Sequence, residues 1–93
     1  MLPMDACNFV AHALRDYLRS FVPESDLKYI DSPLNCGEPW ASIEISLNVA
    51  LEYDVPFPEL YIRRIFELEP LKDSEREYLT ELVEQLPQYP AVA

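Results

Sequence analysis

Prolines constrain this chain more than any other residue type, because nine of them are spread through 93 residues that contain a single glycine. Proline is accepted in the first turn of a helix and breaks a helix interior, so these positions mark starts and stops. They predict an all-α fold, a small single-domain bundle of about four helices with proline-marked loops. The domain is expected to span residues 1–93, with an ordered core over about 4–86 and an extended tail over 87–93.

The first block with helical spacing runs from Met4 to Val22. Hydrophobic residues recur there every three or four positions, which predicts a helix with one apolar stripe. The members of the stripe are Val10, Leu14, Tyr17, Leu18 and Phe21. Pro23 ends the helix, and we expect residues 24–30 to add only a short turn of helix.

Residues 40–53, with the sequence WASIEISLNVALEY, fit two structures. Hydrophobic and polar residues alternate from Ile43 to Tyr53, which is typical of a half-buried strand. A helical stripe is also present, made by Trp40, Ile43, Leu47, Ala50 and Leu51. The segment is long for a strand and ordinary for a helix, and no other segment alternates far enough to supply a partner strand. We therefore predict a helix that is buried on more than one side and lies at the centre of the fold.

The only glycine precedes this helix in the sequence LNCGEPW. We interpret the segment as a hinge and a cap rather than a catalytic turn. Gly37 supplies a backbone conformation that other residues adopt poorly, the charge of Glu38 favours the helix dipole, and Pro39 begins the helix. Trp40 is expected to anchor the core, with a role as an interface anchor as the alternative.

Two further helices are predicted in the second half of the chain. Pro58 and Glu59 open the first, ELYIRRIFEL, in which Leu60, Ile65, Phe66 and Leu68 supply apolar surface. Ser74 and Glu77 have the spacing of a capping box, which predicts the start of the second. Its apolar stripe consists of Tyr78, Leu79, Leu82, Val83 and Leu86.

Charge limits the classes of partner. The chain has 7 basic and 17 acidic residues, which give a net charge of −10 at pH 7. Such a field repels nucleic acid and anionic lipid, so we expect no direct binding of nucleic acid or membrane and an attraction to basic surfaces. Two cysteines and no recognisable signal peptide lead us to expect a cytoplasmic protein.

The sequence offers little material for catalysis or for a cofactor. The single histidine, His12, and the two cysteines, Cys7 and Cys36, lack the spacing of a zinc site or of a Cys-His nucleophilic pair. One glycine cannot build a phosphate-binding loop. Seventeen acids will form close pairs by chance, and a solvated acidic surface is the simpler interpretation of them. We therefore expect no enzyme activity, no metal and no cofactor.

A partner-binding surface is the remaining candidate site. Acidic side chains beside an exposed tyrosine suit a basic partner, because charge speeds the encounter and aromatic burial slows dissociation. The central helix contributes several such residues, its end adds others, and we place two more in the loop before it. The candidates are Asp26, Asp31, Glu44, Asn48, Glu52, Tyr53 and Asp54. The acids from Glu67 to Glu84 form a second, alternative face.

The central stretch YIDSPLNCGEPWASIEISLNVALEYDVPFPELYIRRI resembles a family of small immunity proteins. Gly37-Glu38, Ile43-Glu44 and the run from Glu52 to Pro56 match a pattern of a Gly-Glu turn, an amphipathic helix and an acidic EYD segment. The pattern is that of MafI-type and contact-dependent inhibition immunity proteins of bacterial polymorphic toxin systems, and the resemblance covers about residues 24–86.

The resemblance implies a helical fold and a tight one-to-one complex with a cognate toxin domain, often an RNase of the EndoU type. A nuclease holds a polyanion in a basic cleft, which an acidic domain can cover. Two other functions stay open. One is a phage-encoded acidic mimic of nucleic acid that inhibits a restriction or CRISPR effector, and the other is an adaptor or secretion chaperone that binds an apolar segment.

Overall fold

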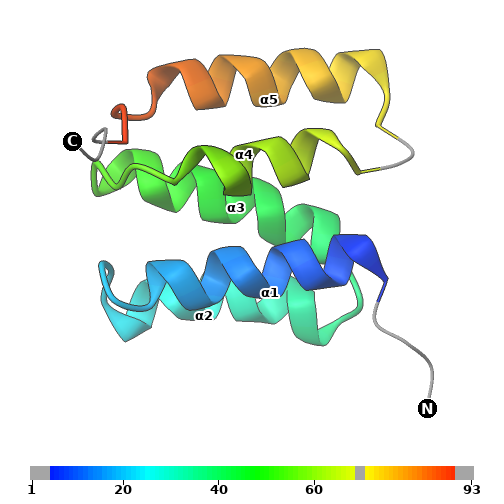
Figure 1. Ribbon diagram of the computed structural model, residues 1–93. Coiled ribbons are helices and arrows are strands. Elements are labelled where there is room, and N and C mark those ends of the chain that lie inside the picture. Colours follow the sequence, from blue (N-terminus) through cyan, green and yellow to red (C-terminus); the bar gives the residue numbers. More distant parts are fainter. Residues whose placement is uncertain (1–4, 69–70, 90–93) are drawn as a thin grey trace.

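Five helices, rather than about four, make up the computed structural model, which describes residues 5–68 and 71–89 (Figure 1). They are α1 (Ala6–Leu18), α2 (Glu24–Asn35), α3 (Pro39–Glu52), α4 (Glu59–Phe66) and α5 (Asp73–Gln85). The described part of the chain contains no strand, so the helical interpretation of residues 40–53 is confirmed. The predicted start at Met4 and the end of the predicted tail lie outside the described residues, and residues 87–89 are not helical.

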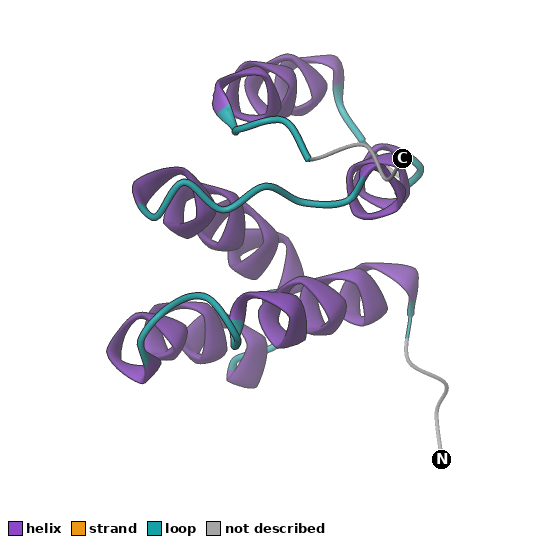
Figure 2. Ribbon diagram, turned by 60° about the vertical axis from the view of Figure 1, so that its left-hand side comes forward, coloured by secondary structure: helices purple, strands orange, loops and turns teal. Residues whose placement is uncertain are grey.

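The helices are arranged in three levels (Figures 1 and 2). The antiparallel pair α1 and α2 forms one level, α3 and α4 form the next, and α5 lies beyond them. Helix α3 contacts α1, α2 and α5, and α4 packs on α1. The prediction that residues 40–53 form the central helix is therefore confirmed.

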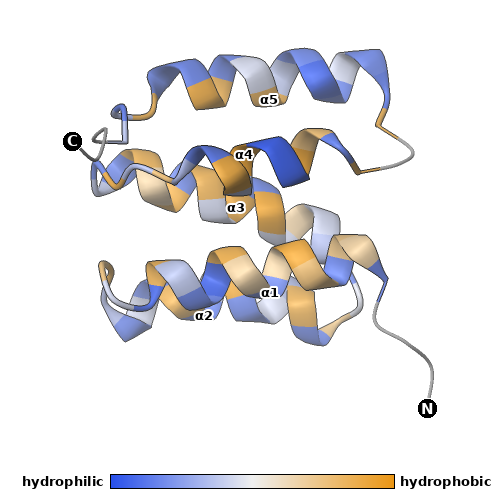
Figure 3. Cartoon of the chain, viewed as in Figure 1, coloured by the Kyte–Doolittle hydropathy of each residue, from blue (hydrophilic) through white to orange (hydrophobic). Residues whose placement is uncertain are grey.

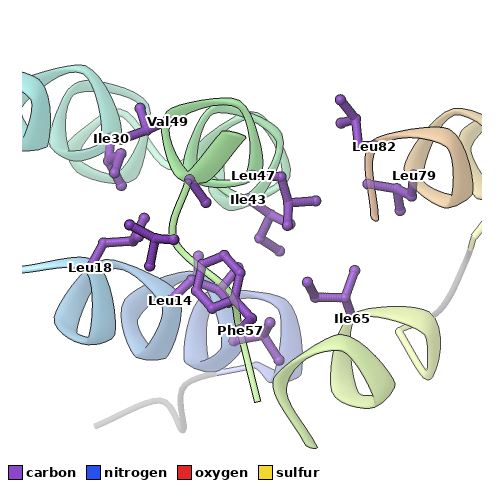
Figure 4. Close-up of a cluster of buried hydrophobic side chains, with 14 of the residues drawn as sticks. Leu14, Leu18, Ile30, Ile43, Leu47, Val49, Phe57, Ile65, Leu79 and Leu82 are labelled. Carbon is purple, nitrogen blue, oxygen red and sulfur yellow. The ribbon is translucent and has the colours of Figure 1, made fainter. Parts of the chain in front are cut away.

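Helix α3 can occupy the centre because it is apolar around most of its circumference. Six of its residues are buried: Ser42, Ile43, Ser46, Leu47, Val49 and Ala50. Ser42 can be buried because its hydroxyl donates to the Ile30 carbonyl oxygen of α2 at 3.1 Å. Figure 4 shows how side chains from all five helices, with Phe57 from the α3–α4 loop, meet in one core.

Helix α1 is shorter than predicted at its C-terminal end. Its first turn is capped by Asp5, whose carboxylate accepts from the Asn8 amide at 2.8 Å. The amides of Phe21 and Val22 both donate to the Leu18 carbonyl oxygen, which turns the chain out of the helix. Val22 is buried by this turn, whereas Phe21 is 51% exposed, so its predicted place in the apolar stripe is wrong.

The full length of helix α2 was not predicted from the proline pattern. The expected short turn over 24–30 is wrong, because the helix continues through Pro33 to Asn35. A proline at this point removes one backbone donor. Burial of Leu27 and Ile30 offsets that loss, since each contributes about 1.5–3 kcal/mol.

The ends of α2 and α3 share one backbone geometry. After α2, the Gly37 amide donates to the Leu34 carbonyl oxygen and the Glu38 amide to that of Pro33. After α3, the Asp54 and Val55 amides donate the equivalent pair of hydrogen bonds to carbonyl oxygens in the last turn of that helix. Both are Schellman caps, which need a left-handed residue, and φ is 76° at Gly37 and 53° at Asp54. The predicted conformational role of Gly37 is confirmed.

Two details of the last helices differ from prediction. Leu60 in α4 is 51% exposed rather than packed, whereas Ile65 and Leu68 are buried. Helix α5 begins at Asp73, and the Lys72 amide donates to the Glu75 carboxylate at 3.3 Å. The predicted capping box of Ser74 and Glu77 is therefore wrong, because the helix begins before Ser74 and the acid at its third position is Glu75.

Candidate partner-binding surface

A shallow depression of about 440 Å³ lies between α2 and α3, and three of the seven candidate residues line it. Asp26 comes from α2, and Asn48 and Glu52 come from α3, where a spacing of four residues places them on one side of the helix. Tyr29, Ile45 and Val49 complete the lining. The depression thus has an apolar floor and wall beside two carboxylates, which suits a side chain with an apolar stem and a cationic head.

Tyr53 adjoins this site through its contact with Asp26. Its hydroxyl donates a hydrogen bond to the Asp26 carboxylate, which ties the end of α3 to α2. That hydrogen bond, followed by desolvation and by the charges of Asp26 and Glu52, raises the pKa of Tyr53 to about 12. The phenol is therefore neutral at physiological pH. Its side chain is 39% exposed, so it neither packs fully inward nor projects freely.

Asn48 extends the surface from α3 towards α5. Its side-chain amide donates to the Glu44 carbonyl oxygen at 2.9 Å and to the Tyr78 hydroxyl of α5 at 3.5 Å. Tyr78 is 43% exposed. The hydrogen bonds from Tyr53 to Asp26 and from Asn48 to Tyr78 thus lie at the two sides of one surface built from three helices.

Glu44 marks the edge of the surface nearest α5. It is half-buried, and desolvation, together with the charge of Glu75, raises the pKa of its carboxyl group. Glu75 itself accepts a hydrogen bond from the Trp40 indole. This bond and the half-buried position of Trp40 support its expected structural role. Two carboxylates thus share the α3–α5 junction.

Asp31 does not join the surface. Its carboxylate accepts two hydrogen bonds from the Arg15 guanidinium, at 2.8 and 3.0 Å, and so links α2 to α1. This pairing lowers the pKa of Asp31. Asp26 and Asp31 also lie within α2 rather than in a loop, which corrects the prediction. Five positions rotate a helix by about 140°, so the two carboxylates leave α2 in different directions.

Asp54 follows Tyr53 at the end of α3 and is exposed. It occupies the left-handed position of the cap, where its charge is close to the negative end of the helix dipole. We define the acidic face as Asp26, Tyr29, Glu44, Asn48, Glu52, Tyr53, Asp54 and Tyr78.

Sequence reasoning missed two aromatic residues of the acidic face. Tyr29 is 65% exposed, and it lies three residues after Asp26 on the same side of α2. Recognising α2 as a full helix would have found it. Tyr78 was assigned to an apolar stripe, and only the packing of α5 shows that it faces outward.

The described residues offer no cluster of three or more His, Cys, Asp or Glu side chains that could hold a metal ion. His12 is exposed. Burial, followed by the charge of Asp5, raises the pKa of Cys7, which is the opposite of what an activated thiol requires. Within residues 5–68 and 71–89, no helix has the length and apolar character needed to cross a membrane.

Comparisons with protein-family models, with curated proteins and with solved structures found no match to this chain. The resemblance to immunity proteins therefore rests on the short motifs between residues 24 and 86.

Proposed function

We propose that this protein is an immunity protein that binds a cognate bacterial toxin domain, a basic nuclease such as an EndoU-like RNase, through its acidic face. The complex contains one toxin per chain and forms in the cytoplasm of the producing or sibling cell. The protein acts by binding to the toxin rather than by catalysis, and it needs no cofactor. The single observation that supports this most is the depression between α2 and α3, in which Asp26 and Glu52 stand beside Tyr29 and Ile45.

The chemistry of the acidic face fits a basic protein better than a small ligand. Arginine and lysine carry long apolar stems below their charged heads, and the depression offers apolar wall and carboxylate together. Exposed tyrosines supply large contact areas with little loss of conformational entropy, which makes them frequent anchors of tight interfaces. The hydroxyl of Tyr53 is already bonded to Asp26, so part of the face is preorganised.

The first test is co-expression with the open reading frame immediately upstream, purification of the tagged protein and a nuclease assay on any captured partner. A stoichiometric complex in which RNA cleavage stops supports the proposal. A partner that stays fully active in the complex contradicts it, as does the failure of every candidate toxin to bind.

Charge reversal inside and outside the acidic face tests the face itself. Glu52→Lys changes the charge beside the depression, and Asp16→Lys makes the same change on α1, where Asp16 is 72% exposed. We expect Glu52→Lys to raise the Kd about tenfold or more and Asp16→Lys to change it much less. Equal effects of the two variants would show that only net charge matters and would remove the acidic face from the proposal.

A nucleic-acid mimic from a phage is the alternative outcome. Such a protein would also bind through its acidic face, but it would compete with DNA or guide RNA for a restriction or CRISPR effector. Protection of an effector in that competition, without any effect on a neighbouring toxin, would select this function instead.

A further inference from the structure

Charge is distributed unevenly over the fold. Helix α1 with its flanking Asp5 and Arg19 carries two acidic and two basic side chains, and α4 with Glu67 also carries two of each. The pair formed by α1 and α4 therefore has no net charge, and the rest of the chain accounts for all of the −10. These two helices pack on each other and lie together at the front of the molecule in Figure 1.

The same pair carries the most apolar exposed side chains. Seven large hydrophobic residues are exposed among those that the structure describes, and four of them are tyrosines, whose hydroxyls can be solvated. The three without any polar side-chain atom are Phe9 in α1, at 66% exposed, Phe21 just after α1, at 51%, and Leu60 in α4, at 51%. Figure 3 shows the N-terminal half of α1 as mostly hydrophobic.

Helix register places Phe9 and Leu60 on the outer sides of their own helices. Phe9 is five residues before buried Leu14 in α1, and Leu60 is five residues before buried Ile65 in α4, so each is turned about 140° away from the core. The Tyr17 ring joins the two helices and the turn after α1, because it lies 5.2 Å from the Tyr61 ring of α4 and 5.1 Å from the Phe21 ring. Helices α1 and α4 run in opposite directions, so the start of α1 lies towards the end of α4 and the end of α1 towards its start (Figure 1). We call this surface the neutral face and define it by Phe9, Phe21 and Leu60.

We propose that the neutral face is the interface of a homodimer of this chain. Two copies that each carry −10 repel one another in most orientations, and the repulsion at contact is smallest where the net charge is zero. A two-fold interface brings the same surface of each copy together, and the Arg63–Glu59 and Arg64–Glu67 ion pairs within each chain leave no unbalanced charge there to repel the second copy. A basic partner has no electrostatic reason to choose this face and is drawn to the acidic face.

The dimer leaves the acidic face free, because the helices α2 and α5 and the outer side of α3 do not belong to the neutral face. Each chain could then hold its own partner, and a complex with one toxin per chain would contain two of each. The inference does not rest on the proposed function, since a dimer can form whether or not a toxin binds.

Salt should change the affinities of the two interfaces in opposite directions. The remaining repulsion between two chains of like charge falls as ions screen it, so dimerisation through an apolar, neutral surface strengthens with salt. Binding of a basic partner by the acidic face weakens under the same conditions.

The test is sedimentation velocity of the full chain from about 10 µM to about 1 mM, at about 0.05 M and about 0.5 M NaCl. We expect a reversible monomer–dimer equilibrium that shifts towards dimer in the higher salt. Phe9→Glu and Leu60→Glu should each weaken dimerisation at least tenfold. Tyr29→Glu is the matched control. Tyr29 is 65% exposed, nearly as much as Phe9, and the substitution adds the same negative charge on the acidic face.

Circular dichroism and thermal unfolding show whether each variant keeps its fold. A chain that stays monomeric at the highest concentration in both salts overturns the proposal. So does a dimer that Tyr29→Glu dissociates while Phe9→Glu and Leu60→Glu leave it intact, because the interface would then lie on the acidic face.

Discussion

Gly37 and Asp54 occupy the same left-handed position in two equivalent caps. Glycine suits this backbone conformation, whereas aspartate does not. A Cβ at Gly37 would meet no atom within 4 Å, so replacing it by alanine costs only the backbone strain. Asp54 bears that strain already, and its charge lies at the unfavourable end of the α3 dipole. Residues that break a local rule are frequent at functional sites, and Asp54 borders the acidic face.

We predict opposite effects on stability at these two positions. Gly37→Ala should lower the free energy of unfolding by about 1 kcal/mol. Asp54→Gly should raise it by about 0.5–1 kcal/mol, because relief of strain outweighs the extra freedom of glycine in the unfolded chain. Urea unfolding measures both. Asp54→Asn separates the contributions, since it removes the charge and keeps a residue that tolerates φ > 0.

The carboxyl groups of Asp31 and Glu44 have pKa shifts of opposite sign, and this predicts opposite pH dependence. The Arg15 pairing lowers the pKa of Asp31, so its stabilisation is present above the unfolded pKa, near 3.8, and is lost as the pH falls through the lower folded value. Burial raises the pKa of Glu44, so its ionisation destabilises the fold as the pH rises above about 4.5.

The matching amide variants test this prediction by chemical unfolding between pH 3 and pH 7. At pH 7, Asp31→Asn should destabilise the protein by about 1 kcal/mol, a modest value because the pair is partly solvated. Glu44→Gln should stabilise it slightly. Both differences should shrink as the native carboxyl groups become protonated, and a Glu44→Gln variant that is less stable than the native chain at pH 7 would contradict the assigned cause.

At the scale of single elements, α5 is held more weakly than α3. Only Leu79 and Leu82 of α5 are buried, against six residues of α3. Its polar links to the rest of the fold are the hydrogen bonds from Trp40 to Glu75 and from Asn48 to the Tyr78 hydroxyl. In addition, Arg76 donates to the Phe66 carbonyl oxygen at 3.4 Å and lies over the Phe66 ring. Local opening starts where few apolar contacts must be broken.

Hydrogen exchange should therefore show the α5 amides exchanging before those of α3. Trp40→Phe removes the indole donor and should speed exchange in α5 by about fivefold to tenfold, which corresponds to roughly 1–1.4 kcal/mol. The α1 and α2 amides should change much less. Equal acceleration in all helices would mean that α5 opens only when the whole domain unfolds.

For the whole molecule, the net charge of −10 is a cost of folding as well as a means of binding. Thirteen of the seventeen acids lie outside the neutral pair of α1 and α4, where only three basic residues offset them. Folding brings these carboxylates closer together than they are in the extended chain, and salt screens their repulsion.

We predict that raising NaCl from about 0.05 to about 0.5 M increases the melting temperature at pH 7. The comparison should be made at a low chain concentration, where the monomer dominates, so that dimerisation does not contribute. At a pH near 4, where many carboxyl groups are protonated, the increase should become small. A melting temperature that falls with salt at pH 7 would show that attractive ion pairs, such as Arg15–Asp31, outweigh the repulsion.

The sequence alone was sufficient for features that depend on neighbouring residues. Proline spacing and helical stripes predicted the all-helical class, the central helix over residues 40–53 and the helix before Pro23. Gly37 could be assigned a backbone conformation that other residues adopt poorly, because glycine accepts a positive φ without strain, whereas its place in the cap of α2 appeared only in the structure. Local preference failed at α2, where burial of Leu27 and Ile30 outweighed the break expected at Pro33.

Only the tertiary structure decided which acids act together. Asp26 and Asp31 look equivalent in the sequence, yet Arg15, sixteen residues before Asp31, engages it in an ion pair, while Tyr53 draws Asp26 to the end of α3. The outward direction of Tyr29 and Tyr78 likewise follows from how α2 and α5 pack on α3. The physical reason is range: helix propensity acts over one or two turns, whereas side-chain partners are chosen by contacts that exist only after the chain has folded.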